Sequence, residues 1–97
     1  MQNDEVKYEI DKLNITVDMF GSILKRKLFH NANSGWKGWD DIKNKEAIEE
    51  RLRKNIDEGF CNKNLINIAI LSMMLYFIQA GLWGQQPENQ KEEACQQ

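Results

Sequence analysis

The stretch LINIAILSMMLYFIQAGLW, residues 65–83, decides the architecture, because hydrophobic residues concentrate there more than elsewhere in the 97-residue chain. Its non-apolar members are Asn67, Ser72, Gln79 and Gly81. A run of this length could just cross a bilayer, but hydrogen-bonding side chains are spread through it and its flanks show no clear bias of positive charge. We therefore predict a helix over residues 63–83 that is apolar on every side, is buried in protein and does not enter a membrane.

Residues 3–30 predict a long first helix with a single apolar seam. Apolar residues recur in steps of three and four, close to the heptad spacing of a coiled coil. The seam consists of Val6, Ile10, Leu13, Val17, Phe20, Leu24 and Leu28. Asn3 is expected to cap the helix ahead of two acidic residues, and the basic residues 25–27 suit the negative end of the helix dipole.

A loop and a shorter amphipathic helix follow. Residues 31–39 (NANSGWKGW) are rich in glycine and asparagine, which favour turns, and the two tryptophans of this loop are expected to pack onto the body of the protein. Asp40 or Asp41 is expected to cap a helix over residues 41–58, which Gly59 ends. The narrow apolar stripe of this helix consists of Ile48, Leu52 and Ile56.

These elements predict an all-α fold. The protomer has three helices: a long first helix, an amphipathic second helix and a fully buried third helix that Asn62 or Asn64 caps. Residues 1–83 form a single domain in this prediction, and the polar residues 84–97 form a disordered tail. One seam and one narrow stripe cannot easily cover a helix that is apolar on every side. We therefore expect a homodimer or higher homo-oligomer that packs as a helical bundle around the third helix and the first seam.

The charge is nearly balanced overall but uneven along the chain. A net charge of −2 argues against a strongly basic protein that binds nucleic-acid polymers. Residues 1–24 carry five acids and two bases, a net −3, whereas residues 25–63 carry ten bases and seven acids, a net +3.

Histidine and cysteine usage narrows the chemistry further. His30 is the single histidine and would have to serve as the base of any catalytic triad, which disfavours that class of enzyme. Cys61 and Cys95 match neither a disulfide framework nor a metal-ligand spacing. The polar N-terminus does not resemble a secretory signal, so we expect a cytoplasmic protein.

The basic middle of the chain contains the candidate binding residues. Arginine offers paired donors to phosphate oxygens, and tryptophan offers a flat face to a nucleobase. An anion pocket would use Arg26, Lys37, Arg51 and Lys54, with walls from Trp36 and Trp39. The alternative is that these cations only complement helix dipoles and keep the surface soluble. Asn64 and Asn67, on one face of the third helix, would point their amides into a polar pocket or hydrogen-bond locally.

Acidic residues on the second helix form another candidate site. They are Glu46, Glu49, Glu50, Asp57 and Glu58. Because Mg²⁺ prefers converging carboxylates, its ligands would be Glu49, Glu50, Asp57 and Glu58. The alternative is a solvated helix face, since Arg53 and Lys54 each follow a glutamate at i, i+4, the favourable order for an ion pair.

A distinctive order of short motifs runs through residues 20–80. The motifs are KL and HN within residues 27–31, GWKGW at 35–39, RL at 51–52 leading to DE at 57–58, and LINIA at 65–69 followed by MML at 73–75. This order resembles the small phage-borne relatives of the MazG-type all-α nucleotide pyrophosphohydrolases. The resemblance implies an oligomer in which glutamates of the second helix, with a Glu and an Asp of the next, hold Mg²⁺ that activates water against a nucleoside triphosphate.

The chain departs from that family at the metal ligands. If Glu49 and Glu50 are the adjacent pair, Arg53 stands where a third glutamate is expected; if the register follows Arg51 and Leu52, the three positions hold Lys54, Asn55 and Glu58. On the next helix, Asn64 and Asn67 stand where a Glu and an Asp are expected. Amides and cations lack the negative charge that a Mg²⁺ site needs. Taken with these departures, the resemblance implies a nucleotide-like ligand without a metal cofactor and without hydrolysis.

The leading hypothesis is sequestration of a nucleotide-like, phosphate-bearing ligand by a catalytically degenerate oligomer. Such a protein would suit phage counter-defence in a host cytoplasm. In this hypothesis Trp36 or Trp39 stacks on the base, and Asn64 and Asn67 contact the base edge or the ribose. The residues that contact the phosphates are Arg26, Lys37, Arg51 and Lys54. Two alternatives stay open: a Mg²⁺-dependent pyrophosphohydrolase, and an anti-defence inhibitor that docks a host protein with its acidic helix.

Overall fold

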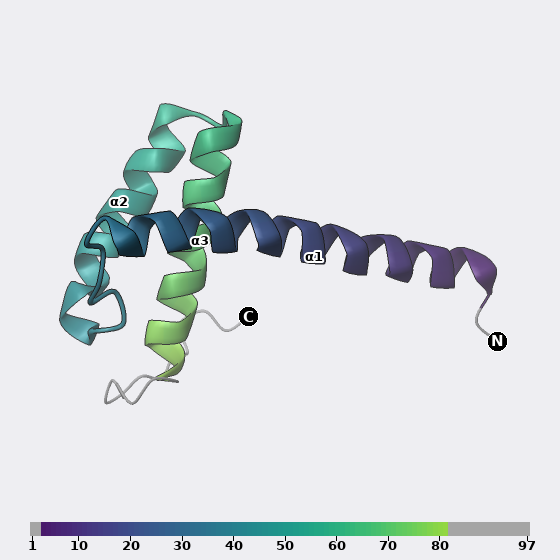
Figure 1. The fold of residues 1–97 in the computed structure, drawn as a ribbon, viewed down its shortest axis with the longest axis horizontal. Coiled ribbons are helices and arrows are strands. Elements are labelled where there is room, and N and C mark those ends of the chain that lie inside the picture. Colours follow the sequence, from purple (N-terminus) through teal and green to yellow (C-terminus); the bar gives the residue numbers. More distant parts are fainter. Residues whose placement is uncertain (1–2, 82–97) are drawn as a thin grey trace. The chain divides into compact units, whose positions relative to one another are not determined.

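The computed structural model describes residues 3–81, and this part of the chain is all-α, as predicted (Figure 1). Its elements are α1 (Asp4–Asn33), the short 3-10 helix η1 (Ile42–Asn44), α2 (Lys45–Glu58) and α3 (Asn62–Ala80). The chain forms two compact units, Met1–Trp36 and Lys37–Gln97. The single domain expected over residues 1–83 stays a prediction, and the expected tail at 84–97 lies outside the described residues.

The first unit is built on α1, a helix of 30 residues and about 45 Å. Asn3 caps it as predicted, because its Oδ1 accepts a hydrogen bond of 3.0 Å from the backbone N–H of Val6. The helix continues to Asn33 instead of ending near His30. The reason lies in side chains that bond the last carbonyls: Asn33 Nδ2 donates to Phe29 O at 3.0 Å and Ser34 Oγ donates to His30 O at 3.1 Å.

This extension changes the role expected of the basic residues near the end of α1. His30 is the basic residue of the last turn, whereas residues 25–27 lie further from the C-terminus of the helix than predicted. The helix dipole acts mainly within the last turn. Complementation of the dipole therefore does not explain the three adjacent cations.

No side chain of α1 is buried. The seam predicted from the sequence lies exposed over its first five members, with Val6 45% and Val17 66% accessible. The other exposed members of the seam are Ile10, Leu13 and Phe20. In this single chain, α1 thus presents a row of apolar side chains to solvent.

The second unit is a hairpin of α2 packed against α3 (Figure 1). The buried apolar side chains of the described residues all belong to it: Ile48 on α2, and Ile70, Leu71, Met74 and Ile78 on α3. On α3 three of these residues are spaced at i, i+4 and i+8, which places them on one face of the helix. Within the described residues, the core is therefore one stripe of α3 together with a single buried residue of α2, Ile48.

Both ends of α3 differ from the prediction. Cys61 occupies the N-cap position without a side-chain hydrogen bond, so neither Asn62 nor Asn64 is the cap. The helix ends at Ala80 and not at residue 83, because Gly81 takes the left-handed conformation (φ 67°) that terminates helices.

Burial of α3 is confined to part of its surface in the single chain. Leu65 and Tyr76 are exposed, the latter by 65%. Within residues 3–81, α3 is the helix that is long and apolar enough to cross a membrane, a test that core helices of soluble proteins also pass. Full burial of α3 therefore remains part of the oligomer proposal below.

Replacing Gly21 by alanine is expected to stabilise α1. A Cβ added there meets no atom within 4 Å, so the variant gains helix propensity of about 1 kcal/mol without a clash. We expect a stronger helical signal in far-UV circular dichroism and a higher urea midpoint. Gly59→Ala is the control, because its space is equally open but its φ of +111° strains any residue with a Cβ. Destabilisation by Gly21→Ala would contradict this account of the helix.

Candidate functional site

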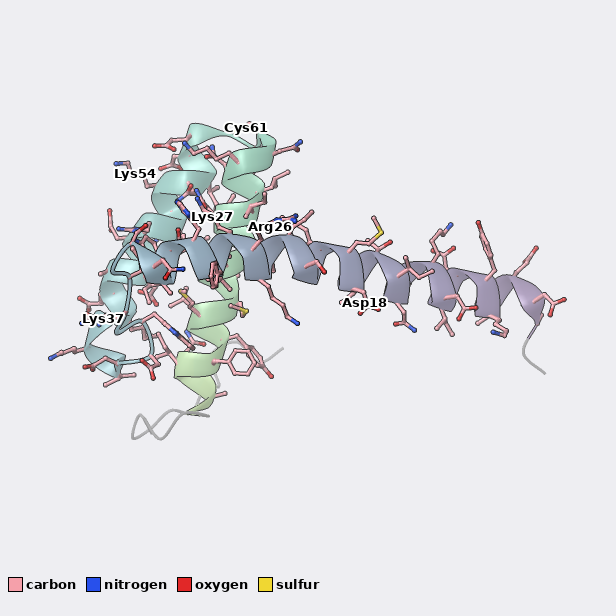
Figure 2. All side chains as sticks on the ribbon, in the orientation of Figure 1. Asp18, Arg26, Lys27, Lys37, Lys54 and Cys61 are labelled. Carbon is pink, nitrogen blue, oxygen red and sulfur yellow. The ribbon has the colours of Figure 1, made fainter. Side chains whose placement is uncertain are left out.

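The predicted binding residues are divided between the two units. Arg26 and Trp36 belong to the first unit. The remainder belong to the second, and they are Lys37, Trp39, Arg51, Lys54, Asn64 and Asn67. The labelled cations in Figure 2 show this division, with Arg26 and Lys27 on α1, Lys37 in the loop before η1 and Lys54 on α2.

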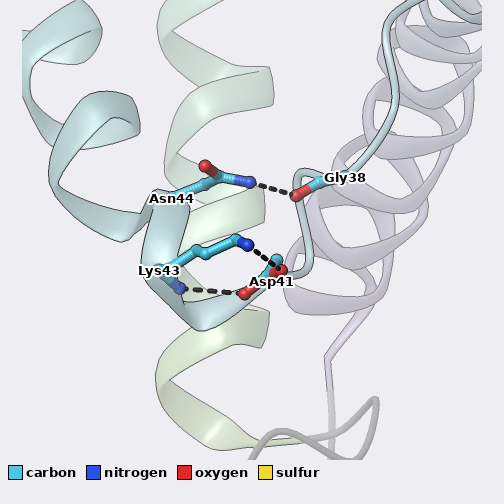
Figure 3. A network of polar contacts seen from close by, with 4 residues as sticks. All are labelled: Gly38, Asp41, Lys43 and Asn44. Carbon is cyan, nitrogen blue, oxygen red and sulfur yellow. Dashed lines mark hydrogen bonds and ion pairs between the residues drawn. The ribbon is translucent and has the colours of Figure 1, made fainter.

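The loop that carries Lys37 and Trp39 is tied to the start of the helical hairpin. Between these two residues, the carbonyl of Gly38 accepts a 2.7 Å hydrogen bond from Asn44 Nδ2 (Figure 3). Gly38 has a φ of +85°, the region that favours glycine. This contact therefore fixes the loop against η1 and limits the positions that Lys37 and Trp39 can take.

Asp41 strengthens the same network, as predicted for a helix cap. Its Oδ1 accepts a 3.1 Å hydrogen bond from the backbone N–H of Lys43, and its Oδ2 lies 3.7 Å from Lys43 Nζ (Figure 3). The sequence prediction placed a continuous helix from residue 41. In the structure η1 comes first and α2 begins at Lys45.

Asn64 is buried and has a structural partner. Its side chain is 8% exposed, and Nδ2 donates a 2.9 Å hydrogen bond to the carbonyl of Gly59. Gly59 ends α2 as predicted, with its own N–H donating to Ile56 O. The Asn64 amide thus closes the α2–α3 connection, which matches the local hydrogen-bonding alternative for this residue.

Asn67 joins α3 to α2 through Asn55, which is not among the binding residues predicted from the sequence. Asn67 Nδ2 lies 3.3 Å from Asn55 Oδ1, and Asn55 Nδ2 donates to the backbone carbonyl of Arg51 at 2.9 Å. Asn55 lies seven residues after Ile48, so the two share a face of α2. A polar residue on an apolar stripe was the signal that could have identified it.

The ion pairs of α2 are not those predicted from the i, i+4 pattern. Glu49 pairs with Lys45 at 3.4 Å, and Glu50 lies 3.9 Å from Arg53. The expected pairs of Glu49 with Arg53 and of Glu50 with Lys54 do not form. Lys54 consequently has no carboxylate partner within residues 3–81.

Arg26 and Lys37 share that property. Neither forms an ion pair with a carboxylate in the described part of the chain. The cations that do form ion pairs there are Lys7, Lys12, Lys43, Lys45 and Arg53. The predicted phosphate ligands Arg26, Lys37 and Lys54 are therefore not among the cations that form ion pairs with a carboxylate within residues 3–81.

The acidic residues of α2 do not converge on a metal position. Among residues 3–81, no group of three or more His, Cys, Asp or Glu side chains could hold a metal ion. Glu49 and Glu50 face cations, while Asp57 and Glu58 lie at the C-terminus of α2, where the helix dipole disfavours carboxylates. In the single chain these four residues form a solvated helix surface.

Comparison of the chain with protein-family models, with curated proteins and with solved structures finds no match. The resemblance to MazG-like proteins therefore stays a prediction from the order of motifs.

Replacing Asn64 by alanine is expected to lower the free energy of unfolding by about 1–3 kcal/mol. The variant leaves the Gly59 carbonyl without its donor at the connection between α2 and α3. Urea unfolding followed by circular dichroism measures the change. Lys63→Ala, at an exposed neighbouring position in the first turn of α3, is the matched control and should unfold within about 0.5 kcal/mol of wild type. A similar loss in both variants would argue against a specific role of the amide.

Proposed function

We propose that this protein binds a nucleotide-like, phosphate-bearing ligand without metal chemistry. The observation that carries the proposal is that Lys37 and Lys54 have no carboxylate partner within residues 3–81, a property they share there with Lys25, Arg26, Lys27 and Lys63, whereas five other cations are paired. Phosphate oxygens can bond unpaired cations without first breaking an internal ion pair. Charge-assisted hydrogen bonds of this kind are among the stronger polar contacts in proteins.

The aromatic residues of the loop support a ligand with a base. Trp36 is 43% exposed, and Trp39 is half-buried beside the network that fixes Gly38. A ring held by its surroundings can stack on a nucleobase at a small cost in conformational entropy. In this proposal Trp39 stacks on the base while Lys37 and Lys54 of the same unit hold the phosphates. Trp36 and Arg26, the other candidates for these two roles, belong to the first unit.

The asparagines divide their roles in the proposal. Asn64 shapes the turn between α2 and α3 through Gly59, so its amide group is already used. Asn67 is half-buried and its Nδ2 is engaged by Asn55, which leaves its Oδ1 as the acceptor that could meet a ribose hydroxyl or a base N–H. In this proposal Asn67 is therefore the residue of α3 that contacts the ligand.

Self-association belongs to the same proposal. A homodimer or higher oligomer would cover the exposed surface of α3 and complete the burial that the single chain leaves partial. The resemblance to MazG-like proteins supports a cytoplasmic, catalytically inactive relative that sequesters a nucleotide, with phage counter-defence as its setting.

A second candidate function is binding to a protein partner. The observation that favours it is the exposed apolar surface of α1, since soluble monomers rarely expose long rows of large hydrophobic side chains. A host protein seated there would make the chain an inhibitor by occlusion.

The ligand proposal is tested by thermal shift with ATP and with inorganic triphosphate, both in excess EDTA. A ligand that binds the native state raises its midpoint of unfolding. The variant Lys37→Gln/Lys54→Gln should bind at least about 100-fold more weakly, because each lost charged contact contributes about 1.5–3 kcal/mol. Lys43→Gln/Lys45→Gln removes the same charge from ion-paired positions of the same unit and should retain binding.

The other outcomes separate the alternatives. Equal losses in the two double variants would show that net charge alone weakens binding, and would contradict a defined site. Turnover of ATP that requires Mg²⁺ and disappears in EDTA would establish the pyrophosphohydrolase alternative. Absence of any shift with either probe would contradict nucleotide binding.

A further inference from the structure

We infer that Asn55 is a positioning residue, which turns the amide of Asn67 so that its oxygen, a hydrogen-bond acceptor, meets the ligand. The inference rests on the proposed function and deepens it, because it assigns the chemistry of the ligand group that Asn67 contacts. That group is a hydrogen-bond donor of the nucleoside, which is supplied by a ribose hydroxyl or by the amino group of the base.

One backbone carbonyl determines the orientation of the Asn55 amide. The carbonyl oxygen of Arg51 accepts a 2.9 Å hydrogen bond from Asn55 Nδ2. A carbonyl oxygen accepts hydrogen bonds and donates none, so the opposite orientation would place Asn55 Oδ1 beside another acceptor. Asn55 Oδ1 is therefore turned away from this carbonyl.

The same argument applies to the next contact, which crosses the hairpin. Because Asn55 Oδ1 is an acceptor, Asn67 turns a donor toward it, and its Nδ2 lies 3.3 Å away. The oxygen and the nitrogen of an amide point in different directions from the same carbon, so this contact turns Asn67 Oδ1 away from Asn55. Within residues 3–81, Asn67 Oδ1 accepts no hydrogen bond.

Partial burial makes this control effective. Asn55 and Asn67 are both half-buried, and their contact joins α2 to α3. Water competes less well for amide groups there than on an open surface, and a wrongly turned amide would lose its partner. The orientation of Asn67 is thus set before a ligand arrives, and a ligand without the matching donor leaves the acceptor unpaired.

The contact lies next to predicted phosphate ligands. Lys54 directly precedes Asn55 on α2 and has no carboxylate partner within residues 3–81 (Figure 2). Arg51, another predicted ligand, lies one turn before Asn55 on the same face of the helix. Neighbouring positions of one hairpin therefore supply a cation for the phosphates and an acceptor for the nucleoside.

The first experiment compares the binding of ATP and two analogues by isothermal titration calorimetry in excess EDTA. One analogue is the dideoxy form of ATP, which lacks both ribose hydroxyls, and the other is purine riboside triphosphate, which lacks the amino group. At least one analogue should bind the wild type about tenfold more weakly than ATP, because it leaves Asn67 Oδ1 without a donor. The weakened analogue identifies the ribose or the base as the source of the donor.

The variants assign this discrimination to the two asparagines. Asn67→Ala should bind ATP and the weakened analogue equally, and Asn55→Ala should lose most of the discrimination. The double variant should lose no more than Asn67→Ala, because Asn55 acts through Asn67. Asn64→Ala is the matched control, since it removes the other amide contact of the hairpin. It should lower stability and leave the ratio of the two affinities unchanged, as would be expected of Asn55→Ala if Asn55 were merely structural.

A second measurement tests the contact in the free protein. In NMR spectra of the wild type, the side-chain amide protons of Asn67 should show a nuclear Overhauser effect to the side chain of Asn55. Asn55→Ala should shift the Nδ2 resonances of Asn67 and leave those of Asn64 in place. Unchanged Asn67 resonances would overturn the inference without reference to any ligand.

The outcomes of the binding experiment separate this inference from the proposed function. If the wild type binds ATP and both analogues equally, or if the discrimination survives in Asn55→Ala, the inference is wrong and nucleotide binding stands. If the wild type binds none of these compounds, the proposed function is wrong and the inference fails with it.

Discussion

The second unit depends on one constraint: one face of α3 must be removed from water, and α2 offers little apolar surface with which to do it. Of the five buried apolar side chains within residues 3–81, four belong to α3, and Ile48 comes from α2. Burial of the α3 stripe is the main favourable contribution to packing. The remaining apolar surface of α3 is what links the fold of one chain to its proposed association with another.

Polar contacts determine how the two helices of the hairpin meet. Apolar contacts have little directionality, whereas a buried amide without a partner destabilises the fold. The bonds of Asn64 to Gly59 and of Asn67 to Asn55 therefore favour one register of α3 against α2. Residues that resembled ligand-binding amides in the sequence thus contribute first to the geometry of the hairpin.

The electrostatics of the chain show a comparable division of roles. Local ion pairs occupy the cations near the start of α1 and along α2, and surface pairs of this kind contribute little to stability. Within residues 3–81, three of the four cations that the sequence predicts as phosphate ligands, Arg26, Lys37 and Lys54, have no carboxylate partner, and the same is true of Lys25, Lys27 and Lys63. The ligand proposal therefore draws on a subset of the cations that the described part of the chain leaves without an ion pair.

The sequence by itself determined the helical class, the order of the helices and the caps at Asn3 and Gly59, and it narrowed the cap after the loop to Asp40 or Asp41, of which Asp41 caps η1. These features depend on periodicity and on hydrogen bonds between residues only a few positions apart, so they are legible without tertiary structure. Only the tertiary structure decided the partners of Asn64 and Asn67, the polar role of Asn55 and the burial of one face of α3 in the single chain. These features depend on which side chains of α2 and α3 meet in the folded hairpin, and on which of several neighbouring side chains reaches a given partner. The spacing of residues along the chain does not specify either.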